Sequence, residues 1–375
     1  MSIAVLGAGL IGSAAARHLA AAGHNVTLIG PGEPTDWASH TGVFGSHYDE
    51  GRITRQLDPI AFWARTSAAS IARYSEIEEQ SGISFFREVG GMMAAPDMSR
   101  TIRNAREDGV PFDRLTPHEA ASFGYHLPTS VTITHETANA GYVSPRRLVA
   151  AQQAAAAKRG ARRLEEVVIA VREEASSVRV ETDTGSHSFD RVLWAAGGFG
   201  APHLDLPTNV QGRTVVMFEV SEAEAERLAR LPTLILADGK LIDIYLLPPI
   251  RYPDGRTYMK IGGGPENMRL RTEEEMRAWF KSGGDADAAR ALSAIFHTLL
   301  PGIDVVSEHM KPCVTTLLPD DLPAIGVLSE RIAVATAGNG RGAKCSDELG
   351  RLGAKALLGD MDAILARMLN PGRFA

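Results

Sequence analysis

Two short apolar runs flank a stretch of small residues at the start of the chain. Residues 3–6 (IAVL) and 25–29 (NVTLI) each suit a buried parallel strand. Between them, residues 13–22 are nearly all small or helix-forming, and Gly23 stands where a helix would end. The pattern therefore predicts a strand, a tight turn, a helix and a second strand.

The predicted turn carries glycines at the spacing G-x-G-x-x-G. The first glycine makes the turn, the second lets the backbone approach a pyrophosphate, and the third lets the helix pack closely on the strand. We expect a dinucleotide to bind here, on Gly7, Gly9, Leu10, Ile11 and Gly12. The motif serves NAD and FAD alike, and a plain α/β turn without a ligand is the alternative.

The acidic residue that usually follows the second strand of such a unit is missing. Its carboxylate would bind a ribose hydroxyl, but Gly30 occupies the position. Glu33 is the nearest acidic residue, and we expect it to reach back to the cofactor.

Helical and strand patterns alternate along the rest of the chain. Helices are predicted at three places, 61–82, 115–124 and 142–163. Strands are predicted at six places, 82–95, 165–198, 214–220, 234–238, 241–250 and 257–264, and the last four alternate like an antiparallel sheet. Residues 331–359 return to a strand, a glycine loop and a helix.

Pieces typical of an α/β cofactor unit thus occur at both ends and in the middle of the chain. We interpret the fold class as α/β, with a discontinuous Rossmann-like cofactor domain and an inserted, mainly antiparallel substrate domain. The cofactor domain would comprise 1–85, 144–213 and 311–375, and the substrate domain 86–143 and 214–310. The length of 375 residues suits two domains better than one core.

The charge and the lengths of the apolar runs limit the kinds of partner that we expect. The net charge of -6 is spread along the chain without a basic block, so nucleic acid is not an expected partner. The start has no charged segment of the signal-peptide kind. No run reaches the ~18 apolar residues of a membrane span. We expect a cytoplasmic monomer that binds no membrane.

The chain has two cysteines, so disulfides are not its framework. Cys313 lies in KPCVTTLLPDDLPAIG, a Pro-rich stretch that we interpret as a loop ahead of an apolar run. From the residues alone, Cys313 is either a small apolar filler of a packed pocket or a nucleophile.

Four stretches together resemble a known family. They are the opening glycine motif; SHYDEGRITR, with the spacing Ser-His-x-x-x-x-Arg-x-x-Arg; YMKIGG, with a lysine on a strand; and KPCVTTLLPDDLPAIG followed by AGNGRGAKCSDELG. Nearly end to end, the chain resembles the D-amino-acid-oxidase-like FAD-dependent oxidoreductases. It is most similar to the branch of monomeric sarcosine oxidase and N-methyltryptophan oxidase. The resemblance implies that the cofactor is FAD and that the cofactor domain is an FAD-binding domain.

The resemblance also implies particular contacts to FAD. Cys313 matches the cysteine that bonds covalently to the flavin 8α-methyl group, and Val168 would hold the adenine through its backbone. Phe199 stands where the family usually has a tryptophan, and Cys345 matches no cofactor residue and is expected to line the pocket. The other implied cofactor residues are Glu33, Ser46, Arg52, Ala196, Gly197, Gly338, Gly340, Gly342 and Lys344.

Two cations match the residues that hold the substrate carboxylate in the family, Arg52 and Lys344. The planar guanidinium of arginine suits a two-point contact with a carboxylate. The alternatives are that Arg52 is a surface arginine paired with Asp49 or Glu50, and that Lys344 contacts a phosphate or solvent.

A third cation, Lys260, is predicted on the inward face of its strand. A buried lysine is costly unless charge is wanted there. In the resembling oxidases such a lysine lies over the flavin and stabilises superoxide, which is electrostatic stabilisation of a developing charge. The alternative is a lysine on the solvent face of the sheet.

The candidate catalytic residues also include His47 and Tyr48, which follow the family spacing. Tyr48 replaces a second histidine of sarcosine oxidase, and Thr315 stands where that enzyme has a tyrosine. Tyr245 and Tyr258 are candidate substrate-pocket residues, with simple packing as the alternative.

These expectations describe an FAD-dependent amine oxidase. It would oxidise the C–N bond of a secondary or N-methylated amino acid to an imine and reduce O2 to H2O2, with no metal. Alternatives are an FAD-dependent amino-acid dehydrogenase or D-amino-acid oxidase of the same fold, or a non-catalytic flavin-binding protein. A nicotinamide-dependent dehydrogenase would leave the carboxyl-terminal cysteine, glycine loop and lysine unexplained.

Overall fold

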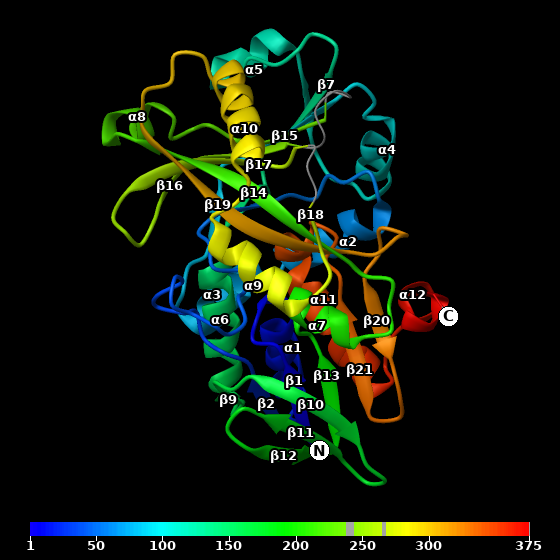
Figure 1. Cartoon of the computed structure of the whole chain (residues 1–375). Helices are drawn as coiled ribbons and strands as arrows, with labels where there is room; N and C mark the ends of the chain where they lie inside the picture. The colour runs from blue at the N-terminus through cyan, green and yellow to red at the C-terminus, as the bar shows by residue number, and fades with distance from the viewer. Residues whose placement is uncertain (238–243, 265–267, 375) are drawn as a thin grey trace.

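The opening motif belongs to a six-stranded sheet, the lower sheet in Figure 1. In the computed structural model, which describes residues 1–237, 244–264 and 268–374, its order is β20-β21-β13-β1-β2-β9. Neighbouring strands are parallel except that β20 is antiparallel to β21. The strands are β1 (Ser2–Leu6), β2 (Asn25–Ile29), β9 (Arg162–Leu164), β13 (Arg191–Trp194), β20 (Ala324–Val327) and β21 (Ile332–Thr336).

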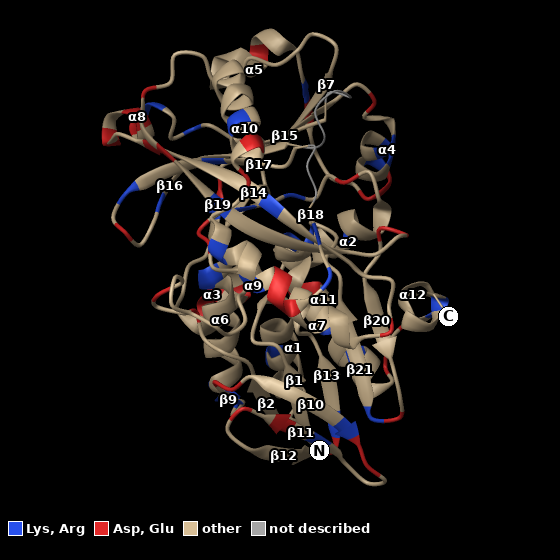
Figure 2. Cartoon of the chain, in the orientation of Figure 1, with Lys and Arg blue, Asp and Glu red and all other residues tan. Residues whose placement is uncertain are grey.

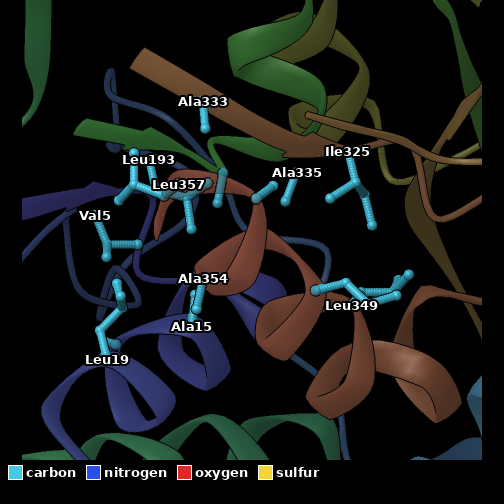
Figure 3. Close-up of a cluster of buried hydrophobic side chains, with 14 of the residues drawn as sticks. Val5, Ala15, Leu19, Leu193, Ile325, Ala333, Ala335, Leu349, Ala354 and Leu357 are labelled. Carbon is cyan, nitrogen blue, oxygen red and sulfur yellow. The ribbon is translucent and has the colours of Figure 1, made fainter. Parts of the chain in front are cut away.

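Two helices cover one face of this sheet, α1 (Leu10–Ala21) and α11 (Gly342–Leu358). Figure 3 shows Val5 and Leu193 of the strands meeting Leu19 of α1 and Leu357 of α11 in one apolar cluster. The helices approach closely because Gly350 lacks a side chain, since a Cβ there would lie 2.6 Å from the Ala14 Cβ. The opposite face is covered by a three-stranded meander, β10 (Val168–Glu173), β11 (Val178–Thr182) and β12 (Ser186–Phe189).

A nine-stranded sheet forms the upper lobe in Figure 1. Its order is β18-β14-β17-β16-β15-β5-β7-β6, and β19 pairs with β14 along almost their whole lengths. All its pairs are antiparallel except β15 with β5. The strands are β5 (Gly91–Ala95), β6 (Asp113–Leu115), β7 (Thr132–Glu136), β14 (Asn209–Val220), β15 (Thr233–Leu236), β16 (Ile244–Arg251), β17 (Thr257–Gly262), β18 (Met268–Leu270) and β19 (Val305–Leu317).

A small antiparallel sheet and further helices complete the described part of the chain. The small sheet is β3 (Arg52–Thr54), β8 (Gly141–Val143) and β4 (Phe86–Glu88). The remaining α-helices are α2 (Ala61–Ile71), α3 (Tyr74–Ser81), α4 (Ser99–Glu107), α5 (Pro117–Phe123), α6 (Pro145–Ala157), α7 (Gly197–Gly200), α8 (Glu222–Arg227), α9 (Glu273–Ser282), α10 (Ala286–Leu299) and α12 (Ala363–Leu369). Two 3-10 turns are η1 (Ala201–His203) and η2 (Pro371–Phe374).

The fold class expected from the sequence is confirmed, with a mainly parallel sheet and a largely antiparallel one. Three local predictions were wrong. The Pro-rich stretch around Cys313 is the end of β19, not a loop, because each of its residues from 311 to 317 pairs with β14. The helix expected at 61–82 is divided into α2 and α3, and the one expected at 142–163 is shortened by β8 and β9 at its two ends.

β14 and β19 run across the domain boundaries expected at 213/214 and 310/311, and the proposed division of domains stays a prediction. The expected strand residues 238 and 241–243 lie outside the described part. Figure 2 shows acidic and basic segments interspersed over both lobes. Among the described residues, no helix is both long and apolar enough to cross a membrane.

Candidate functional site

A pocket lies at the carboxyl ends of β1, β13 and β21 and extends to β19. Most of the residues predicted to bind the cofactor line it, together with both residues of the His-Tyr pair. They are Gly7, Gly9, Leu10, Ile11, Ser46, His47, Tyr48, Arg52, Val168, Ala196, Gly197, Cys313, Gly338, Gly340 and Gly342. Six candidates stand outside its lining, namely Gly12, Glu33, Tyr245, Tyr258, Lys260 and Lys344.

The glycine turn has the geometry that its sequence predicts. Gly7 has a φ of 108°, and a Cβ there would lie 2.4 Å from the Ala195 carbonyl oxygen. A Cβ at Gly12 would lie 1.9 Å from the carbonyl oxygen of Gly7, so glycine alone allows α1 to approach β1. Gly12 thus stands outside the pocket lining but shapes the turn.

The missing carboxylate after β2 has a steric cause. A Cβ at Gly30 would lie 2.6 Å from the backbone nitrogen of Ala8, so no side chain fits there. Glu33 does not stand free to replace it, because its two oxygens accept bonds of 2.6 and 2.8 Å from Arg146. The carboxylate of Glu165 lies 3.5 Å from the Cβ position of Gly32, but it too is paired with an arginine, Arg163.

Cys313 is held from three directions. Arg52 Nη2 donates a hydrogen bond to the Cys313 Sγ at 3.5 Å. The indole nitrogen of Trp279, on α9, donates to the Cys313 carbonyl oxygen at 2.9 Å, and the Ser46 hydroxyl donates to the Val314 carbonyl oxygen at 3.1 Å. The thiol therefore has a fixed place on the pocket wall, next to a cation.

Beside Cys313 lies a group that we call the Asp49 cluster, composed of Asp49, Arg52, Lys260 and Tyr252. Asp49 forms ion pairs with both Arg52 and Lys260, and the Tyr252 hydroxyl donates to it at 2.7 Å. Lys260 Nζ also donates to the Gly51 carbonyl oxygen. Lys260 is 1% exposed, so its predicted inward face is confirmed and the solvent-facing alternative is wrong. Burial, and then Arg52, act to lower the pKa of Lys260, and the Asp49 carboxylate acts in the opposite direction because it favours the ammonium form.

Lys344 belongs to a different group, which we call the Asp58 cluster, composed of Asp58, Arg55, Lys344 and Arg341. Lys344 Nζ lies 2.9 Å from Asp58 Oδ2, and the nearest nitrogens of Arg341 and Arg55 lie 3.2 and 3.7 Å from the same oxygen. Burial alone would raise the pKa of Asp58, but the three cations outweigh it and hold the pKa at about 2. The structure thus separates Lys344 from Arg52 by giving each its own carboxylate.

His47 and Tyr48 lie between the glycine turn and β2. A Cβ at Gly9 would meet the His47 ring at 3.6 Å, and the Tyr48 hydroxyl donates to the Gly32 carbonyl oxygen at 3.0 Å. Burial and the nearby Arg146 lower the pKa of His47 to about 3, so its imidazole is neutral at pH 7. Burial raises the pKa of Tyr48 to about 12.

The two candidate tyrosines of the sheet differ in their surroundings. The Lys260 ammonium lies 5.9 Å from the ring centre of Tyr245, and burial raises the pKa of Tyr245 to about 12. The Tyr258 hydroxyl donates to Asp254, in the turn between β16 and β17. The prediction that Cys345 lines the pocket is wrong, because Cys345 lies on α11 and is buried in the core against Trp63.

A family model described as FAD dependent oxidoreductase matches residues 2–356. The chain belongs to the FAD-dependent oxidoreductase family. No curated protein matches the sequence.

Solved structures of similar fold include members with different activities. NikD, described as an unusual amino acid oxidase essential for nikkomycin biosynthesis, superposes with a TM-score of 0.78 at 19% identity, over 99% of this chain and 97% of that one. L-proline dehydrogenase from P. horikoshii gives 0.79 at 19% identity, over 100% and 97%. Glycine oxidase from Geobacillus kaustophilus gives 0.69 at 22% identity, over 96% and 95%. At these identities the likeness establishes the fold.

The pocket fits the FAD of this family. The helices α1 and α11 both begin at the pocket, and their N-cap residues Gly9 and Arg341 make no side-chain capping bond, so the first backbone N–H groups are available to a phosphate. A Cβ at Gly197 or Gly342 would meet nothing within 4 Å, which leaves bare backbone facing the pocket. These turns would hold the pyrophosphate, with Val168 at the adenosine end and Cys313 at the flavin end.

Sequence reasoning missed the acids that organise the cations. The sequence offers Asp49 only as an alternative partner of Arg52, and that pairing is present, though Arg52 is not at the surface. Asp58 and Arg55 were not singled out, although Arg55 is the second arginine of the Ser-His-x-x-x-x-Arg-x-x-Arg segment. A three-residue spacing of opposite charges was the available signal for both pairs, Asp49 with Arg52 and Arg55 with Asp58.

Proposed function

We propose that the protein is an FAD-dependent amine oxidase that oxidises the C–N bond of a secondary or N-methylated amino acid. The observation that carries the proposal is that Arg52 and Cys313 line one end of the glycine-lined pocket, and that Lys260 is connected to Arg52 through Asp49, just outside the lining. A non-catalytic flavin-binding protein has no use for a buried lysine and a pocket-lining arginine at this place. The named oxidases among the proteins of similar fold lend further support.

Arg52 is the residue that we assign to the substrate carboxylate. It lines the pocket, and a planar guanidinium matches a carboxylate. Its terminal nitrogens contact Asp49, Gly51, Ser46 and Cys313 in the structure, so a substrate carboxylate would share or replace these contacts. Lys344 as a second carboxylate ligand stays a prediction, because Asp58 is its partner in the structure. Bound FAD supplies the acceptor for two electrons and two hydrogens of the amine, which leaves as the imine.

Lys260 is the residue that we assign to the oxygen reaction. Dioxygen takes two electrons and two protons and leaves as H2O2, and negative charge develops on it at the start. A fixed ammonium in a site that excludes water stabilises this charge strongly because the effective dielectric is low.

Cys313 is assigned to covalent attachment of FAD. The S–H bond and one C–H bond of the 8α-methyl group would be replaced by an S–C bond, and the two hydrogens would leave with O2 as H2O2. Arg52 supports this role because its hydrogen bond to the Cys313 Sγ holds the sulfur at the pocket wall. Acid precipitation should leave the yellow colour in the pellet, and Cys313→Ala should release it. Complete release of flavin from the wild type would refute the linkage.

A substrate screen tests the function itself. Secondary and N-methylated amino acids, sarcosine among them, are added anaerobically and the flavin absorbance is followed, and the same set is assayed in air for peroxide. We expect bleaching and peroxide with amino acids that keep a free carboxylate, and little with the corresponding amines. Bleaching without peroxide would indicate a dehydrogenase, and no bleaching with any amine would refute the proposal. A cytoplasmic location and a monomeric state belong to the same proposal.

A further inference from the structure

The ammonium of Lys260 is enclosed by protein and has one carboxylate partner among the described residues. Lys260 is 1% exposed on β17, and its Nζ lies 2.5 Å from Asp49 Oδ2 and 2.5 Å from the Gly51 carbonyl oxygen. Asp49 comes from the loop that precedes β3, so this contact joins the pocket loop to the nine-stranded sheet. Its other oxygen accepts the Tyr252 hydroxyl at 2.7 Å, which fixes the carboxylate in place.

The groups around Lys260 make Asp49 necessary to its charge. Arg52 and Lys311 both repel an ammonium at this position, and burial disfavours it further. Glu50 is the other nearby acid, but Arg146 and the Ser144 hydroxyl occupy its oxygens. Cys313 adds some attraction, without a direct contact to Lys260.

Tyr245 and Tyr252 face the same space and stay neutral, since burial raises the pKa of each. Without Asp49, Lys260 would therefore be a buried cation among cations. A buried lysine in that position releases its proton rather than remaining charged.

We propose that Asp49 is a positioning residue that keeps Lys260 in the ammonium form and aims it at the site of oxygen reduction. The inference rests on the proposed function, because it concerns the residue assigned to the oxygen reaction. Its consequence is that the speed of that reaction depends on a carboxylate that need not touch the substrate. In the oxygen reaction Asp49 acts through Lys260, as counter-ion and hydrogen-bond acceptor, and its separate ion pair with Arg52 concerns substrate binding.

The pH dependence of the reoxidation rate distinguishes an effect of Asp49 on the charge of Lys260 from a merely structural effect. Holoenzyme is reduced photochemically without any substrate and mixed with oxygenated buffer in a stopped-flow instrument between pH 6 and 9. Wild type should reoxidise rapidly over the whole range, and Lys260→Met should be roughly 100- to 1,000-fold slower at every pH. Asp49→Asn should approach the wild-type rate at pH 6 and fall toward the Lys260→Met rate as the pH rises, because Lys260 then loses its proton.

Two further variants serve as controls. Asp49→Glu keeps the charge and should keep the flat profile, which also covers the case in which Asp49→Asn folds poorly. Glu219→Gln changes a partly buried acid of the neighbouring strand β14 that pairs with Arg256 and not with Lys260, and its profile should match the wild type.

An NMR titration measures the protonation of Lys260 directly and needs no turnover. The chain has seven lysines, so the Cε resonances of 13C-labelled protein can be resolved, and the Lys260 signal is the one missing from Lys260→Met. It should titrate at a lower pH in Asp49→Asn than in the wild type. An unchanged titration, or an Asp49→Asn enzyme that reoxidises like the wild type at all pH values, would overturn the inference.

The remaining outcomes are also decisive. If Asp49→Asn is slow at every pH without recovery in acid, Asp49 places Lys260 but does not keep it charged, and the inference is wrong in its main part. If the wild type itself reoxidises no faster than Lys260→Met, the proposed oxidase function fails, while the lysine titration still decides the role of Asp49.

Discussion

The Asp49 cluster and the Asp58 cluster each gather a buried lysine and one or two arginines around a single aspartate. Lys260 is 1% exposed and Lys344 is 2% exposed, so both ammonium groups are removed from water to the same degree. The clusters differ in their neighbours. Arg52 of the Asp49 cluster lines the pocket, whereas none of the four residues of the Asp58 cluster does.

The difference follows from the elements that each cluster joins. Asp58 lies before α2 and meets Lys344 in α11, so the cluster connects the start of one helix to another helix. Asp49 lies in the loop before β3 and meets Lys260 on β17, so the cluster connects that loop to the nine-stranded sheet. Residue types alone therefore do not tell a site from a structural ion pair, because position relative to the pocket decides.

The largest effect is expected from removing the acid of the structural cluster. Asp58→Asn leaves Lys344 and two arginines without their buried carboxylate, and breaking such a pair from one side costs about 3–5 kcal/mol. The free energy of unfolding in urea should fall by this amount. Asp287→Asn removes an exposed ion pair with Arg290 and should cost at most about 1 kcal/mol. If the two substitutions lower the free energy of unfolding equally, the buried ion pairs of Asp58 stabilise the fold no more than an exposed ion pair does.

A second comparison sets the two lysines against each other. Lys260→Met should slow reoxidation of reduced enzyme by O2 roughly 100- to 1,000-fold and leave anaerobic reduction by substrate near normal. Lys344→Met should leave reoxidation near normal and lower the stability instead. Stopped-flow spectra of the two half-reactions measure both. Unchanged reoxidation in Lys260→Met would remove the main support for an oxidase.

Much of the fold was predictable because its signals are local. The strand–turn–helix–strand unit at the start depends on Gly7 and Gly12, because a Cβ at either position would collide with nearby backbone. Such glycines are visible in the sequence. The stretch around Cys313 was not predictable as a strand, since Pro312 and Pro319 suggest a loop. Its conformation is set by pairing with β14, about 100 residues earlier in the chain.

The sequence named residues that lie at one pocket, but it did not name the contacts between them. Arg52, Cys313 and the glycine turns meet at one pocket, as the resemblance implied. The partners of Lys344 were not predictable, because Asp58 is far from it in the sequence and nothing in the motif names it. The absence of a carboxylate at position 30 was visible, but its cause, the close approach of Ala8, appears only in the fold.

A third prediction concerns substrate binding and separates Arg52 from Lys344. Arg52→Ala should lose one charge-assisted contact to the carboxylate, roughly 1.5–3 kcal/mol of binding or transition-state stabilisation. Lys344→Met should change kcat/KM much less if Asp58 is its true partner. Steady-state kinetics on an accepted amino acid and on its carboxylate-free amine measure this. Equal losses in both variants would restore Lys344 as a carboxylate ligand, and full efficiency of Arg52→Ala would exclude Arg52.

The smallest effect is the acid sensitivity of the Asp58 cluster. The pKa of Asp58 is about 2 in the folded protein against an ordinary value of 3.8, because its three cationic neighbours favour the carboxylate. A lowered pKa stabilises the fold above the ordinary pKa, and this contribution is lost as the pH falls toward 2. The shift corresponds to about 2 kcal/mol.

The difference in unfolding free energy between wild type and Asp58→Asn should therefore be constant from pH 7 to about 5 and shrink by about 2 kcal/mol toward pH 2. Urea titrations of both proteins at several pH values give this difference, in which the other carboxylates cancel. A difference that stays constant down to pH 2 would show that the three cations do not act on Asp58 through charge.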